Sequence, residues 1–187
     1  HDGIDGVTVH VEGRPDVRLL VGGVDPLRGV ELLDELELTP VVLPELEALR
    51  GVGQNPNHHL DVLGHTLAVL ERWLEIEADL PTYSGDRAGE VAALLREPLA
   101  DELTRGDALR FACLLHDTGK PATRNVTPDY VTFIGHDKVG AEIVDGLCRR
   151  LRTSRRLANH LSTLTLHHLR LGFMVRERPL PARRVHD

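Results

Sequence analysis

Aromatic residues, cysteines and long apolar runs are all scarce in this chain of 187 residues. Aromatic residues make up only 3% of it, and two cysteines are too few for the disulfide framework of a small secreted domain. No apolar run approaches the roughly 20 residues that a membrane helix needs. The N-terminus lacks the basic and apolar pattern of a signal peptide. These absences predict a reduced, cytoplasmic protein with no membrane partner.

Positive charge is also in deficit, because the formal net charge is −7 and the pI is about 5.9. This balance argues against a basic nucleic-acid surface over the whole chain. Two local arginine clusters remain, and each is interpreted first as a solvated helix end. They consist of Arg149, Arg150, Arg152, Arg155 and Arg156, and of Arg176, Arg178, Arg183 and Arg184.

Hydrophobic periodicity and breaker residues predict an all-α, mainly helical fold with a single sizeable core. Asn57 and Asp107 are expected to cap two of the helices. Minor β character is expected near the N-terminus and at residues 130–134. The expected helices cover residues 25–37, 44–51, 58–79, 87–97, 107–117, 136–151 and 154–170, with a loop at 80–86 and one further helical turn at 99–105.

Histidine is unusually frequent, with eleven in the chain. His116 and Asp117 are adjacent at the end of an apolar helical run, and a Gly-Lys-Pro turn follows them. His65 and His168 fall on apolar helix faces, and His136 opens a helix. Burying several imidazoles costs free energy unless each finds a partner. Either one shared divalent metal satisfies them together, or each makes its own hydrogen bond in the core.

Three motifs make the chain resemble the HD superfamily of metal-dependent phosphohydrolases: His65, LLHDTGKP around His116 and Asp117, and FIGHDKVGAEI around His136. Residues 32–71 are similar to the linker and first HD helix of bacterial tRNA nucleotidyltransferase and poly(A) polymerase family proteins. LHHLRLG at 166–172 resembles a later histidine motif of that branch. The resemblance covers residues 25–172.

The resemblance implies a helical HD domain that binds one or two divalent metal ions: Mn, Ni, Fe, Mg or Co. His65, His116 and Asp117 would bind the first ion, and His136 and His168 would bind a second ion or contact phosphate. The implied metal ligands are thus His65, His116, Asp117, His136 and His168; the implied catalytic residues are Asp117, Lys120 and His136; and the implied substrate-binding residues are Lys120, Arg124 and His168. For Arg124, a solvated loop position is the competing interpretation.

The same resemblance suggests four segments. Residues 1–24 form a poorly defined N-terminal segment, 25–57 a helical linker, 58–172 the HD domain and 173–187 a tail. We expect this tail to be cut before the last HD helix, which carries a further metal-binding aspartate in the family. The Asp-x-Asp pair of a nucleotidyltransferase head is absent from the sequence, so nucleotide addition by this chain is not predicted.

Two functions follow as hypotheses. The first is a phosphohydrolase that cleaves a phosphomonoester or a cyclic nucleotide phosphate through a metal-activated water, with a phosphorylated nucleotide or an RNA end, including tRNA, as the partner. The alternative is a non-catalytic tRNA- or RNA-binding accessory module of a nucleotidyltransferase. A third interpretation is that the histidines are purely structural. The sequence defines neither the substrate nor the oligomeric state.

Overall fold

The chain is mainly helical, as its sequence predicts. The computed structural model describes residues 20–23, 25–54 and 59–174. Its longer helices are α2 (Pro26–Glu35), α5 (Val62–Ala78), α7 (Ala88–Arg96), α8 (Arg105–Leu115), α10 (His136–Arg150) and α11 (Arg155–His167). Its short helices are α3 (Thr39–Val42), α4 (Pro44–Glu47), α6 (Leu80–Ser84), the 3-10 helix η1 (Gly85–Arg87), α9 (Lys120–Thr123) and α12 (Arg170–Met174). None of the described helices combines the length and apolar character needed to span a membrane.

Two small antiparallel hairpins complete the described secondary structure. β1 (Pro98–Ala100) pairs with β2 (Leu103–Thr104), and β3 (Asn125–Val126) pairs with β4 (Val131–Thr132). The second hairpin confirms the strand expected at residues 130–134. Most of the segment with β character expected near the N-terminus, and most of the expected tail at 173–187, lie outside the described residues; Leu20 and Val21, at the end of that segment, are helical instead.

The β1–β2 hairpin replaces the helical turn that the sequence predicts at 99–105. Asp101 and Glu102, at the tip, have φ values of 53° and 61°. A two-residue hairpin turn of the I′ type needs positive φ at both central positions, and Asn or Gly normally supplies it. Asp101 suits the first of these positions, but Glu102 stands at the second, where Gly is usual, so the sequence signal of the turn is incomplete. The Asp101 carboxylate accepts a hydrogen bond from the Ser154 backbone N–H at 2.8 Å, which ties the hairpin to the start of α11.

Three other local predictions are corrected by the caps that the structure contains. Thr104, and not Asp107, caps α8, and Asp107 completes a capping box with it. Asp61 caps α5, so this helix starts at Val62 instead of residue 58; Asn57 lies outside the described residues. The segment at 80–86 is α6 followed by η1 instead of an open loop.

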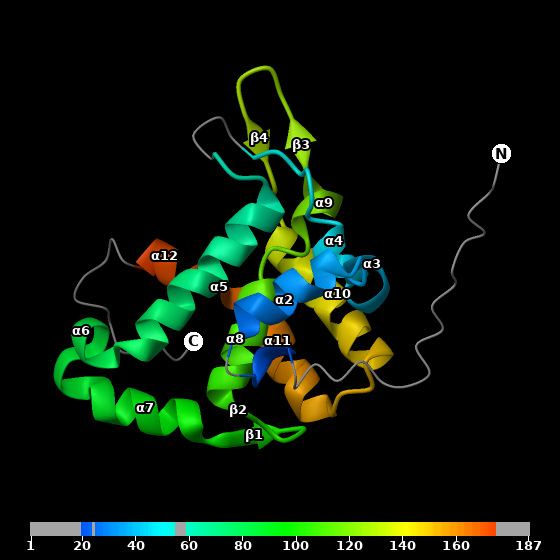
Figure 1. The fold of residues 1–187 in the computed structure, drawn as a ribbon. Helices are drawn as coiled ribbons and strands as arrows, with labels where there is room; N and C mark the ends of the chain where they lie inside the picture. Colours follow the sequence, from blue (N-terminus) through cyan, green and yellow to red (C-terminus); the bar gives the residue numbers. More distant parts are fainter. Residues whose placement is uncertain (1–19, 24, 55–58, 175–187) are drawn as a thin grey trace.

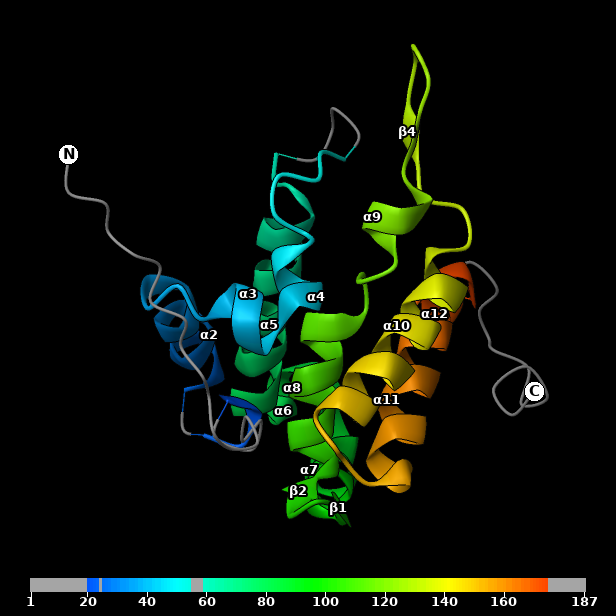
Figure 2. The same cartoon turned by 90° about the vertical axis from the view of Figure 1, so that its right-hand side faces the viewer.

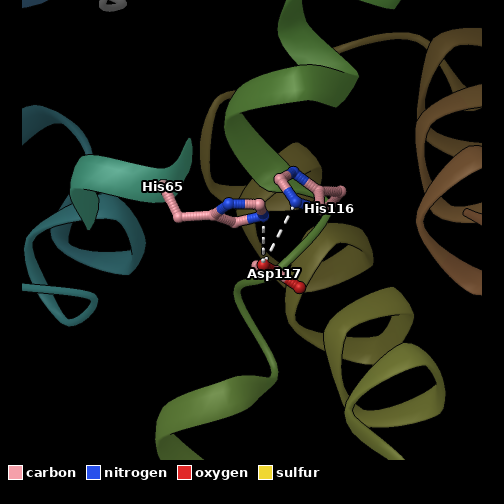
Figure 3. Close-up of side chains that lie close together, drawn as sticks. All are labelled: His65, His116 and Asp117. Atoms are coloured by element: carbon pink, nitrogen blue, oxygen red, sulfur yellow. Dashed lines mark ion pairs between the residues drawn. The ribbon is translucent and has the colours of Figure 1, made fainter. Parts of the chain in front are cut away.

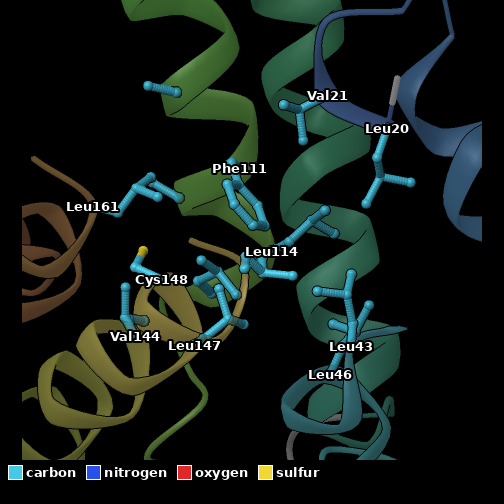
Figure 4. Close-up of a cluster of buried hydrophobic side chains, with 14 of the residues drawn as sticks. Leu20, Val21, Leu43, Leu46, Phe111, Leu114, Val144, Leu147, Cys148 and Leu161 are labelled. Carbon is cyan, nitrogen blue, oxygen red and sulfur yellow. The ribbon is translucent and has the colours of Figure 1, made fainter. Parts of the chain in front are cut away.

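The core lies where α8 packs between α5 on one side and α11 on the other, with α10 packed against α11 (Figure 1 and Figure 2). Phe111 and Leu114 of α8 are fully buried, and they point toward Leu147 of α10 and Leu161 of α11 (Figure 4). Fully burying one such side chain stabilises a fold by about 1.5–3 kcal/mol. This core fixes the relative positions of the four helices.

The packing brings four helix ends together at one end of the bundle. They are the start of α5, the end of α8, the start of α10 and the end of α11, and the β3–β4 hairpin projects from this same end (Figure 2). Every histidine of the predicted metal site lies on or directly beside one of these helix ends.

Candidate metal centre

Asp117 is the centre of the histidine cluster. It lies just beyond the end of α8, and only 2% of its surface is exposed. His116, the C-cap of that helix, and His65, from the first turn of α5, both point toward it (Figure 3). The His116 Nε2 and His65 Nε2 atoms lie 3.1 Å and 3.5 Å from Asp117 Oδ2. These three residues form the first ligand group that the sequence predicts.

The second carboxylate oxygen of Asp117 faces two further imidazoles. His136 Nε2, at the start of α10, lies 3.4 Å from Asp117 Oδ1, and His168 Nε2, at the end of α11, lies 3.7 Å from it. One carboxylate is thus surrounded by four imidazoles from four helices. Its potential ligand atoms fall into two groups, one with His65 and His116 and one with His136 and His168, and each group lies within 4.8 Å.

Backbone carbonyls fix the tautomer of three of the four rings. In each, Nδ1 lies against the carbonyl oxygen of the residue three positions earlier: Cys113 for His116 at 2.8 Å, Phe133 for His136 at 2.7 Å and Thr165 for His168 at 2.6 Å. A carbonyl oxygen only accepts, so each Nδ1 carries the hydrogen. In the neutral ring Nε2 then presents a lone pair, which is the state that binds a metal.

The Nε2 atoms and the Asp117 oxygens are all acceptors, and they converge with too few hydrogen-bond donors among them. His136 Nε2 and His168 Nε2 lie 3.2 Å apart. Asp117 Oδ2 is buried, and although Lys120 Nζ is 2.7 Å away, no described group makes a hydrogen bond of acceptable geometry to this oxygen. A buried acceptor without a donor is costly, and a cation among these atoms removes the cost. Imidazole nitrogens with one carboxylate also suit borderline divalent metals, so the residues present fit such an ion.

Charge interactions keep Asp117 ionised. Burial is the largest influence on its pKa and alone would raise it, but contacts with His116, His136 and Lys120 outweigh burial and hold the pKa well below its usual range. Contact with Asp117 raises the pKa of His136, whereas burial lowers the pKa of His168. The centre therefore presents an anionic carboxylate among imidazoles of unequal basicity.

A close backbone contact places Asp117 against α10. A Cβ atom on Gly119 would lie 2.1 Å from the backbone oxygen of His136 and 2.5 Å from the nitrogen of Gly140. Real Cβ atoms do not approach so closely, so only glycine allows the chain after Asp117 to touch the first turn of α10. The Gly-Lys-Pro turn thus brings His136 to the carboxylate.

The structure separates the two predicted phosphate-binding cations. Lys120 is largely buried beside the centre, with its side chain 12% exposed, and its ammonium donates a hydrogen bond to Gln54 Oε1 at 2.9 Å. Arg124 is exposed, and its Nε atom donates to the Gly53 backbone oxygen at 3.1 Å. Arg124 therefore lies at the rim of the centre. The Phe133 ring, 5.3 Å from Lys120 Nζ, is a further neighbour.

Gln54 and Phe133 were not among the residues that the sequence predicts for the site. Both lie outside regular helices, and no spacing rule marks them; only the contacts with Lys120 reveal them. Of the other histidines, His59 and His167 are exposed and belong to neither ligand group.

Comparison with known proteins agrees with the resemblance to the HD superfamily. The family model described as "HD domain" matches residues 62–186. The A-adding tRNA nucleotidyltransferase of Deinococcus radiodurans is 36% identical over 141 residues, which cover 74% of this chain and 27% of that protein. The CC-adding tRNA nucleotidyltransferase of Thermus thermophilus is 32% identical over 145 residues, covering 75% and 27%. The multifunctional CCA protein of Acidovorax sp. is 34% identical over 130 residues, covering 68% and 24%. The chain thus spans about a quarter of the length of these relatives.

Proposed function

Because the chain belongs to the HD-domain family, we propose that it is a metal-dependent phosphohydrolase that cleaves a phosphomonoester or a cyclic nucleotide phosphate. The observation that carries this proposal is the buried Asp117 carboxylate, which lies between two groups of imidazole Nε2 atoms. A carboxylate with imidazole groups on both sides suits a pair of adjacent divalent ions, the arrangement of two-metal hydrolytic sites.

We assign the ligands by the two groups of atoms. His65, His116 and Asp117 would hold one ion, and Asp117, His136 and His168 would hold the other. When bound, divalent ions such as Mn, Ni, Fe, Co or Mg supply a nucleophilic water near neutral pH and neutralise phosphoryl oxygens. The identity and number of the ions are part of the proposal.

The chain's own cations have separate tasks in this proposal. The ammonium of Lys120, 2.7 Å from Asp117 Oδ2, lies close enough to the ligand cluster to neutralise a phosphoryl oxygen of the bound substrate. His136, on the other side of Asp117, would act through its neutral Nε2 atom as a ligand of the second ion. Arg124, at the rim, would meet a more distant phosphate of the same substrate.

The substrate class comes from the relatives. Their names describe enzymes that add nucleotides to tRNA, so we propose that the hydrolysed group belongs to a phosphorylated nucleotide or to an RNA end, including that of tRNA. We also place the protein in the cytoplasm, consistent with two free thiols.

The alternative function, a non-catalytic RNA-binding module, gains little support from the arginines near the end of α10. Arg149 pairs with Asp145 at 3.1 Å and Arg150 pairs with Glu45 at 2.6 Å.

The test is a hydrolysis screen on metal-loaded protein. The wild-type chain, loaded in turn with Mn²⁺, Ni²⁺, Co²⁺, Fe²⁺ and Mg²⁺, is assayed with nucleoside monophosphates, cyclic nucleotide phosphates and RNA carrying a terminal phosphate. We expect turnover that EDTA abolishes, that is lost in the His116→Ala, Asp117→Ala double variant and that persists in His167→Ala. Equal background rates in wild type and double variant would overturn the proposal, and RNA binding that ignores the double substitution would favour the module.

A further inference from the structure

We propose that Gln54 is a positioning residue that holds the Lys120 ammonium at the metal centre while Asp117 is engaged with metal. The proposal rests on the proposed function, because it assigns Lys120 to the substrate phosphate. It extends that function to a segment before α5 in which no sequence motif marks a functional residue.

The argument begins with the neighbours of Lys120. Its ammonium has a charged partner, Asp117 Oδ2 at 2.7 Å, and a neutral partner, Gln54 Oε1 at 2.9 Å. The Phe133 ring, with its centroid 5.3 Å away, adds a cation–π contact. With Asp117 serving as a metal ligand, its charge would be shared with the ion and would no longer neutralise the lysine. Among the described residues, Gln54 Oε1 is then the acceptor that holds the ammonium.

Gln54 is itself held in place from the other side. Its amide nitrogen lies 3.4 Å from the Leu60 backbone oxygen, which orients Oε1 toward the lysine. The Asp61 carboxylate accepts hydrogen bonds from Gly51 N at 2.6 Å and Gly64 N at 2.7 Å. The backbone oxygen of Val52 accepts from Val62 N at 3.0 Å. Residues 51–54 are therefore fixed to the first turn of α5, the helix that carries His65.

The same segment is also tied to the phosphate-binding side. Arg124 Nε donates to Gly53 O at 3.1 Å, next to the bond between Lys120 and Gln54. Residues 51–54 thus connect the α5 ligand with α9 and the start of β3. Two adjacent positions of this segment accept hydrogen bonds from the two cations assigned to the substrate.

The chemistry of the amide explains why glutamine suits this position. An amide oxygen accepts from the ammonium but leaves its positive charge uncompensated, so the charge stays available to a phosphate dianion. A carboxylate here would neutralise the lysine and repel the substrate. An alanine would leave a long and flexible side chain without an anchor when Asp117 is occupied.

A spectroscopic experiment reads this contact directly, because the sequence contains only two lysines, Lys120 and Lys138. Lysine labelled with ¹⁵N at Nζ gives an ammonium signal that is visible where hydrogen bonds slow its exchange. Lys138 is exposed, so fast exchange should remove its signal, and Lys120→Arg confirms the assignment of the signal that remains. With Zn²⁺ as a diamagnetic probe, we expect the Lys120 signal in wild type and its loss in Gln54→Ala. It is retained in Arg124→Ala, which loosens the segment without removing the amide.

The same ammonium experiment, carried out without metal, separates this proposal from the proposed function. In an Asp117→Ala background, which removes both acceptor oxygens of the carboxylate, the Lys120 signal is expected to depend on Gln54 even if the chain binds no metal. Circular dichroism confirms that each variant is folded. A Lys120 signal that persists in Zn²⁺-loaded Gln54→Ala and in the Asp117→Ala, Gln54→Ala double variant overturns the positioning role and leaves the phosphohydrolase proposal intact.

A binding measurement adds the functional consequence. Titration of Mn²⁺-loaded protein with inorganic phosphate is expected to show about tenfold weaker binding for Gln54→Ala, the scale of one lost hydrogen bond to a charged group. Gln54→Glu is expected to weaken binding further, and Lys138→Ala to leave it unchanged. Phosphate affinity equal to wild type in both Gln54 variants, alongside reduced affinity in Lys120→Ala, would contradict the proposal.

Discussion

His136 Nε2 and His168 Nε2 lie 3.2 Å apart, although both rings use Nδ1 for a backbone carbonyl oxygen. Two neutral rings in these tautomers point lone pairs at each other. Either a proton on His136 or a cation bound by both rings removes the conflict. The Asp117 oxygen nearest to both rings completes a ligand group in the second case.

This relationship predicts that His168 binds the second of two ions. His168→Ala is expected to lower the metal content of the loaded protein from two equivalents to one, because His65, His116 and Asp117 remain in place. His167→Ala is the matched control, since this neighbouring imidazole is exposed and outside both ligand groups. Elemental analysis after removal of excess metal measures the change. Two equivalents in His168→Ala would mean that a proton, and not a cation, joins the two rings.

The second prediction concerns the close approach at Gly119. Gly119→Ala places a methyl group against the backbone of His136 and Gly140, and neither can move without shifting α10. We expect a loss of roughly 3 kcal/mol or more in the free energy of unfolding, at or above the usual range for overpacking. Denaturant titration measures it. Gly146→Ala, in α10 with no atom within 4 Å of the added Cβ, should instead stabilise by about 0.5–1 kcal/mol. Similar effects at both positions would show that the contact is not rigid.

The sequence was sufficient to predict the helices of the core and the inward-facing histidines, whereas the choice of metal ligands is implied by the resemblance to the HD superfamily and stays a prediction. Apolar positions at helical spacing marked α8, α10 and α11, and the same spacing turned His168 and His65 toward the carboxylate. These signals are local, because helical period and side-chain direction depend on neighbours three or four residues away. The structure accordingly brings His65, His116, Asp117, His136 and His168 together.

What the sequence could not predict depends on contacts between distant segments. The hydrogen bond between Lys120 and Gln54 joins residues 66 positions apart, and no periodicity connects them. The β1–β2 turn uses positive φ at Asp101 and Glu102, and Glu102 stands where Gly is usual. The start of α5 was misplaced because its cap, Asp61, also accepts a hydrogen bond from Gly51 N, ten residues earlier, and helical spacing does not reveal such a contact.

The double role of Asp61 gives the third prediction. Asp61→Ala removes the α5 cap and the bond to Gly51 N, so the expected loss is about 1–2 kcal/mol in the free energy of unfolding. Asp79→Ala, which removes a single cap bond of 3.4 Å from a short exposed helix, should cost less. Thermal or denaturant unfolding of the two variants measures the difference. Equal losses would show that the bond between Asp61 and Gly51 contributes nothing to stability.

The fourth prediction concerns the two thiols. Burial raises the pKa of Cys113 to about 12 and raises the pKa of Cys148 as well. At pH 8 the folded Cys113 thiol is therefore almost entirely protonated, whereas an unfolded thiol with a pKa of about 8.5 is roughly one-quarter ionised. Alkylation with iodoacetamide at pH 8 is expected to be more than a hundredfold slower in native protein than in denaturant. Rapid labelling of native protein at either cysteine, located by mass spectrometry, would contradict this packing.

The measurement that tests the account most directly is the metal content of wild type and Asp117→Asn, because this carboxylate is the ligand that both groups share. The substitution keeps the size of the side chain and removes its charge. After loading with Mn²⁺ and removal of free metal, the account predicts two equivalents in wild type, none in Asp117→Asn and two in His167→Ala. Wild-type protein without bound metal, or Asp117→Asn with its full content, would contradict the claim that Asp117 organises a divalent metal centre.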